Sequence, residues 1–142
     1  MPFDYLSSVK KHFYQYKSLG DKTMEQLDEK NLFWQYNDQS NSIAVIVQHL
    51  WGNMLSRWTN FLTEDGEKES RERDAEFERV IKTKEELITK WDAGWHCLFA
   101  ALNSVREADL DKTIYIRQEP QIVIDAINRQ LAHYSYHVGQ KV

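Results

Sequence analysis

The stretch that decides the fold is VIDAINRQLAHYSYHVG, residues 123–139. Its apolar side chains recur every three or four residues, which is the period of an α-helix with one buried face. They are Val123, Ile127, Leu131, Tyr134 and Val138. We therefore expect a last helix that begins after Pro120, continues to the end of the chain and buries this stripe against other helices.

Three further segments show the same period, at about residues 4–27, 42–62 and 84–105. Four helices of this length, with connections of moderate size, predict an all-α fold, a four-helix bundle. The length of 142 residues indicates a single domain over 1–142. A helical N-cap prefers a small polar residue, so Ser42 or Asn41 is expected to begin the second helix.

Two details concern the ends of these segments. Ile114, Tyr115 and Ile116 are β-formers, so a short extended segment is expected before the last helix. HVGQKV, residues 137–142, carries no C-cap signal. We therefore expect either a last helix that frays at its end or a chain that is truncated within that helix.

Composition excludes several classes of protein. The net charge is −4, whereas nucleic-acid binders usually carry a basic surplus, so no nucleic-acid partner is expected. No apolar run approaches the roughly 20 residues that span a bilayer, and the N-terminus has no signal-peptide pattern. Cys97 is the single cysteine and cannot form an intramolecular disulfide. These features predict a cytoplasmic protein with no membrane partner.

Three histidines are the candidate site. His133 and His137 stand four residues apart, so on a helix they share one face and can chelate one metal ion. His49 lies on a small, polar, uncharged flank of the second helix and would complete a three-histidine set. Imidazole suits zinc, nickel, iron and copper, so the metal stays open. The structural alternative is that these side chains are polar filling in a helical scaffold.

Other polar residues have simpler explanations. His12 and His96 are expected on the surface, and Cys97 is expected as a small buried apolar side chain. Arg117, just before the last helix, forms either a weak surface ion pair or a contact with an anionic group of a substrate. Asn53 and Gln130 lie on the same helix flanks as the histidines and are candidates to orient the imidazoles.

The single histidine in QHLWGNM (residues 48–54), together with the H-x3-H pair in HYSYHVGQ (residues 133–140), resembles the DinB/YfiT-like superfamily, whose members are regarded as metalloenzymes. RDAEFE, IRQEP and AINRQLAHYSYHVGQ resemble an uncharacterised bacterial branch of that group. The resemblance covers nearly the whole chain. It implies a four-helix bundle that binds one divalent ion through His49, His133 and His137, and often a homodimer.

Characterised relatives in that superfamily include transferases that use low-molecular-weight thiols and a maleylpyruvate isomerase. The resemblance therefore implies a metal-dependent enzyme, a thiol-dependent S-transferase or a hydrolase, that acts on a small-molecule substrate. Zinc or nickel is the expected ion, with a low-molecular-weight thiol as a second cofactor. The alternative is a stress-related helical bundle that binds a metal or a small ligand without catalysis.

Overall fold

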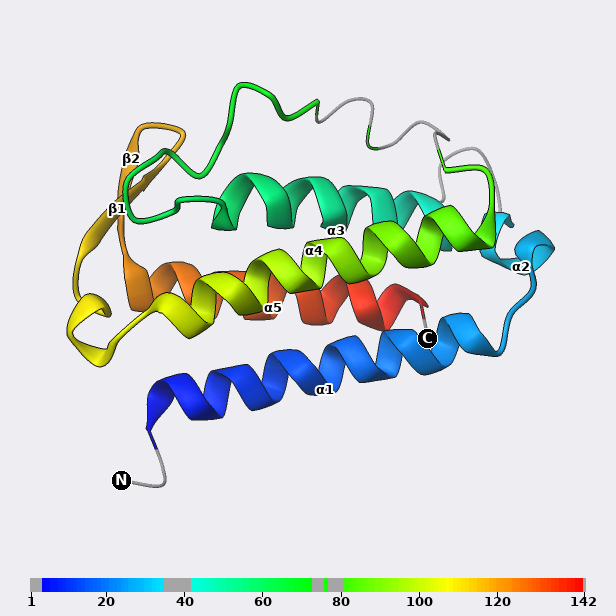
Figure 1. The fold of residues 1–142 in the computed structure, drawn as a ribbon, viewed down its shortest axis with the longest axis horizontal. Coiled ribbons are helices and arrows are strands. Elements are labelled where there is room, and N and C mark those ends of the chain that lie inside the picture. The colour runs from blue at the N-terminus through cyan, green and yellow to red at the C-terminus, as the bar shows by residue number, and fades with distance from the viewer. Residues whose placement is uncertain (1–3, 35–41, 73–75, 77–80, 142) are drawn as a thin grey trace.

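The computed structural model describes residues 4–34, 42–72, 76 and 81–141. In this part of the chain, four long helices lie side by side: α1 (Tyr5–Glu25), α3 (Ile43–Trp58), α4 (Lys84–Ser104) and α5 (Val123–Lys141) (Figure 1). α3 packs against α4 and α5, and α1 packs against α5 and α4. The predicted all-α bundle is confirmed. None of the described helices is both long and apolar enough to cross a bilayer.

Side-chain caps begin the first three of these helices. Asp4 Oδ1 accepts from Ser7 N at 2.7 Å, and Thr83 Oγ1 accepts from Glu86 N at 3.1 Å. Ser42 Oγ accepts from Val45 N at 3.1 Å, so the predicted cap of α3 is confirmed. Each cap satisfies one backbone N–H that has no partner within its own helix.

The core between the helices is rich in aromatic rings. Its largest fully buried side chains include Trp91, Trp95, Phe13 and Tyr134. α3 and α4 approach closely at Gly94, where a Cβ atom would lie 3.3 Å from the Cα atom of Trp51. This close packing makes α3 a rigid support for the polar residues on its other face.

The second helix ends earlier than expected. α3 stops at Trp58 rather than Leu62, because Thr59 has an extended backbone with a ψ of 116° and Asn60 adopts a left-handed one with a φ of 50°. From there residues 59–72, which we call the strap, run back along α3 (Figure 1). The carbonyl oxygen of Gly66 accepts hydrogen bonds from Ser56 Oγ and from Arg57 Nη1, both at 2.7 Å. The strap is therefore tied to the bundle despite its high charge.

The extended segment is one half of a hairpin. β1 (Thr113–Ile116) pairs in antiparallel fashion with β2 (Glu119–Ile122). α5 consequently begins at Val123 rather than directly after Pro120, whose missing N–H is tolerated in a two-stranded ribbon. Two short helices were also not predicted: α2 (Glu29–Phe33) and the 3₁₀ helix η2 (Glu107–Asp109).

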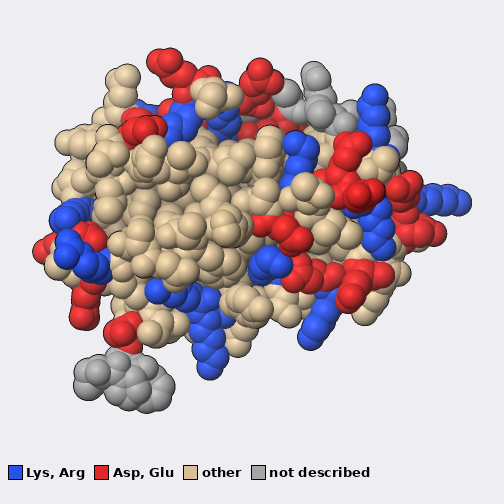
Figure 2. Space-filling model, in the orientation of Figure 1, with Lys and Arg blue, Asp and Glu red and all other residues tan. Residues whose placement is uncertain are grey.

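The surface carries charges of both signs. Figure 2 shows Lys and Arg mixed with Asp and Glu at the end of the molecule near α2. A broad area without charged side chains lies left of centre on the same face. No continuous basic stripe crosses the described part of this face.

Candidate metal centre

The three predicted histidines meet in space. His49 comes from α3, and His133 and His137 come from successive turns of α5. One ring nitrogen from each lies within 4.8 Å of the other two. The ring centroid of His49 lies 5.4 Å from the centroid of His133 and 4.8 Å from the centroid of His137. His49 is buried and the other two are half-buried, so the cluster faces a sheltered space.

The spacing suits one metal ion. In a tetrahedral zinc site with Zn–N distances near 2.0–2.1 Å, ligand nitrogens lie roughly 3.3 Å apart. The histidine nitrogens are within 4.8 Å of one another, a separation that small side-chain rotations can close. These are also the only three-residue metal-ligand cluster of His, Cys, Asp or Glu in the described residues.

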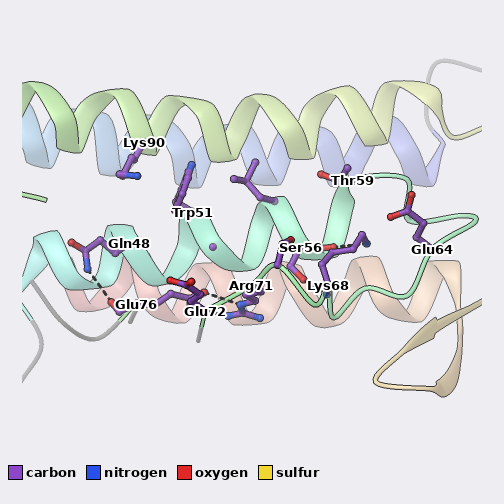
Figure 3. A pocket seen from close by; sticks show the side chains of 13 residues that line it. Gln48, Trp51, Ser56, Thr59, Glu64, Lys68, Arg71, Glu72, Glu76 and Lys90 are labelled. Atoms are coloured by element: carbon purple, nitrogen blue, oxygen red, sulfur yellow. Dashed lines mark hydrogen bonds and ion pairs between the residues drawn. The ribbon is translucent and has the colours of Figure 1, made fainter. Parts of the chain in front are cut away.

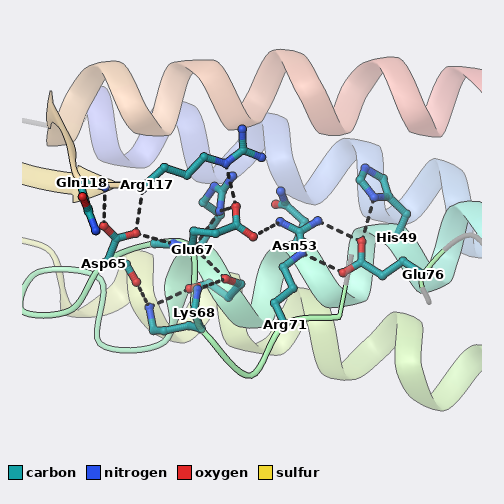
Figure 4. Close-up of polar contacts among 12 residues, drawn as sticks. His49, Asn53, Asp65, Glu67, Lys68, Arg71, Glu76, Arg117 and Gln118 are labelled. Carbon is teal, nitrogen blue, oxygen red and sulfur yellow. Dashed lines mark hydrogen bonds and ion pairs between the residues drawn. The ribbon is translucent and has the colours of Figure 1, made fainter. Parts of the chain in front are cut away.

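Glu76 fixes the orientation of His49. Its Oε1 lies 3.0 Å from His49 Nδ1 (Figure 4). Burial raises the pKa of Glu76, but hydrogen bonds from Arg71 and His49 outweigh it and hold that pKa below its usual value. The ionised carboxylate accepts the Nδ1–H, which makes Nε2 the metal-binding nitrogen of His49. A carboxylate that orients a metal-binding histidine in this way also raises the basicity of the ring.

Arg71 holds Glu76 in turn. Arg71 Nε donates to Glu76 Oε2 at 2.8 Å, and Arg71 Nη2 donates to Glu76 Oε1 at 2.9 Å. The Arg71 side chain is only 2% exposed. Such a two-point bond fixes the plane of the carboxylate and therefore the direction of its bond to His49.

Gly52 leaves the space that Glu76 occupies. A Cβ atom at this position of α3 would lie 2.1 Å from Glu76 Oε2. Any larger residue would push the carboxylate away from the helix. Gly52 thus allows Glu76 to reach His49 across the surface of α3.

His133 and His137 are poised as neutral ligands. Burial, and then the nearby rings of His137 and His49, lower the pKa of His133 to about 4. Burial also lowers the pKa of His137, although its bond to Gln140 acts in the opposite direction. His137 Nδ1 lies 2.8 Å from Gln140 Oε1 and donates to it, so its Nε2 carries the lone pair.

One buried ring nitrogen of the cluster has no hydrogen-bond partner among the described residues. His133 Nε2 is buried, and no atom of the described residues forms a hydrogen bond with it. A buried nitrogen without a partner is unfavourable by about 1–3 kcal/mol. A metal ion at the centre of the cluster would remove this cost, so the residues present fit a divalent ion.

The predicted accessory residues lie close to the histidines. Asn53 Oδ1 accepts from Tyr134 OH at 2.6 Å, and no described imidazole bonds to it. Gln130 is buried and its Oε1 has no partner in the described structure. Both line a cavity of about 390 Å³ beside His49 and His133, which Arg117 also lines. That Asn53 and Gln130 orient the imidazoles, and that Arg117 contacts an anion, stay predictions.

A larger cavity of about 580 Å³ lies elsewhere, between α3, α4 and the strap (Figure 3). Trp51, Lys68 and Lys90 are among its lining residues, and none of the three histidines is. Arg71 lines both cavities and so stands in the wall between them. We therefore assign the chemistry to the smaller cavity.

The remaining candidates lie outside the site. His12 and His96 are exposed, as predicted, and Cys97 is half-buried. Sequence reasoning missed Glu76 and Arg71, which belong to a charged connection that reads as solvent-exposed. One available signal was Gly52, since a glycine inside a helix often marks the close approach of another group.

A comparison with protein-family models assigns the sequence to a known group. The family model described as "Protein of unknown function (DUF1572)" matches residues 1–142. DUF1572 is a DinB/YfiT-like family, in agreement with the resemblance carried by the histidines. No curated protein matches the chain.

Proposed function

This chain belongs to the DUF1572 family, and from that membership and its three converging histidines we propose that it is a divalent-metal-dependent enzyme. His49, His133 and His137 would hold the ion. The observation that carries the proposal is the cluster itself: three imidazole nitrogens within 4.8 Å, supported by a buried carboxylate. A set of three protein ligands, three histidines among the known combinations, is typical of catalytic zinc sites, which keep an open position.

A bound divalent ion would supply a Lewis-acidic centre at which a water molecule or a thiol loses its proton near neutral pH. The protein supplies the rest. Glu76 and Gln140 fix the rings of His49 and His137. Low pKa values keep His133 and His137 unprotonated, and hence able to bind a metal, at neutral pH.

The cavity beside the histidines supports a small-molecule substrate. Its volume of about 390 Å³ is within the range of cofactor and ligand sites. Gln130 Oε1 lines it as a buried acceptor without a described partner, and so can accept a hydrogen bond from a hydroxyl, amine or thiol. We propose thiol-dependent S-transfer or hydrolysis as the reaction class, with zinc or nickel as the ion.

Metal analysis of protein purified without a metal-binding tag tests this proposal. After reloading with zinc or nickel, we expect one ion per chain, and almost none in a His49→Ala/His137→Ala variant. His96→Ala is the matched control, because His96 is an exposed histidine outside the cluster. No metal above background in the reloaded wild type would refute the proposal.

Assays with low-molecular-weight thiols and electrophiles then separate an enzyme from a binding protein. Metal-dependent thiol transfer or hydrolysis that disappears in the double variant supports an enzyme. Tight metal binding without turnover on a broad panel of substrates would instead favour a module that binds a metal or small ligand without catalysis.

A further inference from the structure

The cavity beside the histidines is lined by an unusual number of guanidinium groups. They come from four separate segments: Arg57 of α3, Arg71 of the strap, Arg117 of the β1–β2 turn and Arg129 of α5. Glu119 is the one carboxylate among the described residues that line it. A space with this lining is electrostatically suited to an anion.

Two of the four arginines are engaged by the protein. Arg71 makes its two-point bond to Glu76 and also lies 3.4 Å from Glu67 Oε1. Arg57 Nη1 donates to Gly66 O at 2.7 Å and to Glu67 Oε2 at 3.2 Å. These two guanidinium groups therefore mainly serve to build the wall of the cavity.

The other two retain donors. Arg117 Nε donates to Glu67 Oε2 at 3.0 Å, but its two terminal amino groups bond to no described residue (Figure 4). Arg129 is exposed and forms no ion pair within the described structure. One carboxylate, Glu67, is thus shared by Arg57, Arg71 and Arg117.

The pKa of Glu67 is lowered by the arginines around it. Burial raises its pKa, but the hydrogen bond from Arg117 and the charges of Arg57 and Arg71 outweigh it and leave that pKa below its usual value. Glu67 is therefore ionised at neutral pH. Together with Glu76 it supplies two carboxylates for the three guanidinium groups of Arg57, Arg71 and Arg117.

Two buried polar atoms in the wall lack partners. Arg57 Nε is a donor on a side chain that is 10% exposed, and Gln130 Oε1 is an acceptor on a residue that is 5% exposed. Each is buried without a hydrogen bond to the described residues. The residues that line the cavity thus include two polar atoms whose hydrogen-bonding capacity the described protein does not use.

The turn that carries Arg117 is held in place. Arg117 and Gln118 have φ values of 55° and 67°, a left-handed pair that forms a two-residue hairpin turn. Asp65 of the strap accepts both of their backbone N–H groups, at 2.8 and 2.7 Å. This contact fixes the base of the Arg117 side chain at the rim of the cavity.

We propose that this cavity is a binding site for the oxyanion group of a small substrate, a carboxylate or a phosphate. Arg117 and Arg129, whose guanidinium groups retain donors, bind the anion. Arginine suits this role because its planar fork donates two parallel hydrogen bonds to an oxyanion. The inference rests on the proposed function only for the reacting end of the substrate, which would lie at the three histidines.

Calorimetric titration tests the anion site directly. The probes are malonate, inorganic phosphate and the neutral analogue malonamide. Each is added in one series to protein that a chelator has stripped of metal, and in a second series to the same protein after loading with zinc. We expect malonate or phosphate, but not malonamide, to bind the metal-free protein. Because hydrogen bonds to charged groups are strong, Arg117→Gln and Arg129→Gln should each weaken binding about tenfold.

Arg106→Gln is the matched control, since it removes the same charge from a side chain that is not in the cavity wall. Arg129→Lys keeps the charge but loses the fork, and should fall between the wild type and Arg129→Gln. Tighter binding of malonate identifies a carboxylate, and tighter binding of phosphate identifies a phosphate. The proposal is overturned if neither anion binds, or if the two cavity variants bind as tightly as the control.

Zinc binding by the same variants keeps this result separate from the proposed function. We expect zinc affinity to be unchanged in Arg117→Gln and Arg129→Gln. Arginine-dependent anion binding in a protein that binds no zinc would leave the anion site standing and refute the metal enzyme. Zinc binding with no arginine-dependent anion binding would refute the anion site and leave the proposed metal site standing.

Discussion

Gly52→Ala should weaken metal binding without unfolding the protein. The new Cβ atom would lie 2.1 Å from Glu76 Oε2, whereas ordinary contact begins near 3.4 Å. The carboxylate must therefore retreat by roughly 1 Å. That shift would lengthen the 3.0 Å contact with His49 beyond hydrogen-bond range.

The size of the effect follows from the role of the carboxylate. Loss of a group that orients a metal-binding histidine typically lowers metal affinity by about 10- to 100-fold. This corresponds to about 1.4–2.8 kcal/mol of binding free energy. The fold should tolerate the change, because the clash falls on the end of a side chain and alanine favours a helix over glycine by about 1 kcal/mol.

Competition for zinc with a chelating dye measures the affinity, and urea unfolding measures the stability. Gly139→Ala is the matched control: it lies in α5 two residues after His137, and its Cβ atom would meet nothing within 4 Å. Glu76→Ala, which removes the carboxylate outright, should match Gly52→Ala. Equal zinc affinity in Gly52→Ala and Gly139→Ala would show that Glu76 does not support the site.

Two further changes test the framework of the site. Tyr134→Phe leaves Asn53 Oδ1 and Trp58 Nε1 without their buried partner, so we expect a loss of about 2–4 kcal/mol in unfolding free energy. The control, Tyr136→Phe, changes an exposed side chain and should lose almost none. Equal urea midpoints for the two variants would contradict this. Backbone hydrogen bonds lower the pKa of Asp65. Its stabilising effect is therefore present above the unfolded-state pKa near 4 and lost as pH falls through the lower folded-state value. Asp65→Asn should flatten the acid limb of the stability curve, and an unchanged acid limb would exclude this role.

The bundle could be predicted from sequence because its signals are local. The stripe from Val123 to Val138 appears as α5, and the Ser42 cap begins α3 as expected. The hairpin partner could not be predicted, because Glu119–Ile122 has no alternation of apolar and polar residues. Its pairing depends on contacts made by β1, which lies earlier in the chain.

The histidines of the candidate site could likewise be predicted from local sequence, whereas Glu76 could not. The spacing of His133 and His137 follows from helix geometry, and their meeting with His49 follows from the packing of α3 on α5. The position of Glu76 beside His49 depends on a long connection that folds back over Gly52. The hydrophobic periodicity of the sequence does not indicate a contact of this kind. A charged residue in a charged segment carries no sign of burial until that segment is placed.

X-ray absorption at the zinc edge of the reloaded protein tests the central claim most directly, since it reports the atoms around the ion. We predict one zinc per chain with three imidazole nitrogens at about 2.0–2.1 Å, reduced to two in His133→Ala. A spectrum dominated by oxygen ligands, or one that does not change in His133→Ala, would contradict the account.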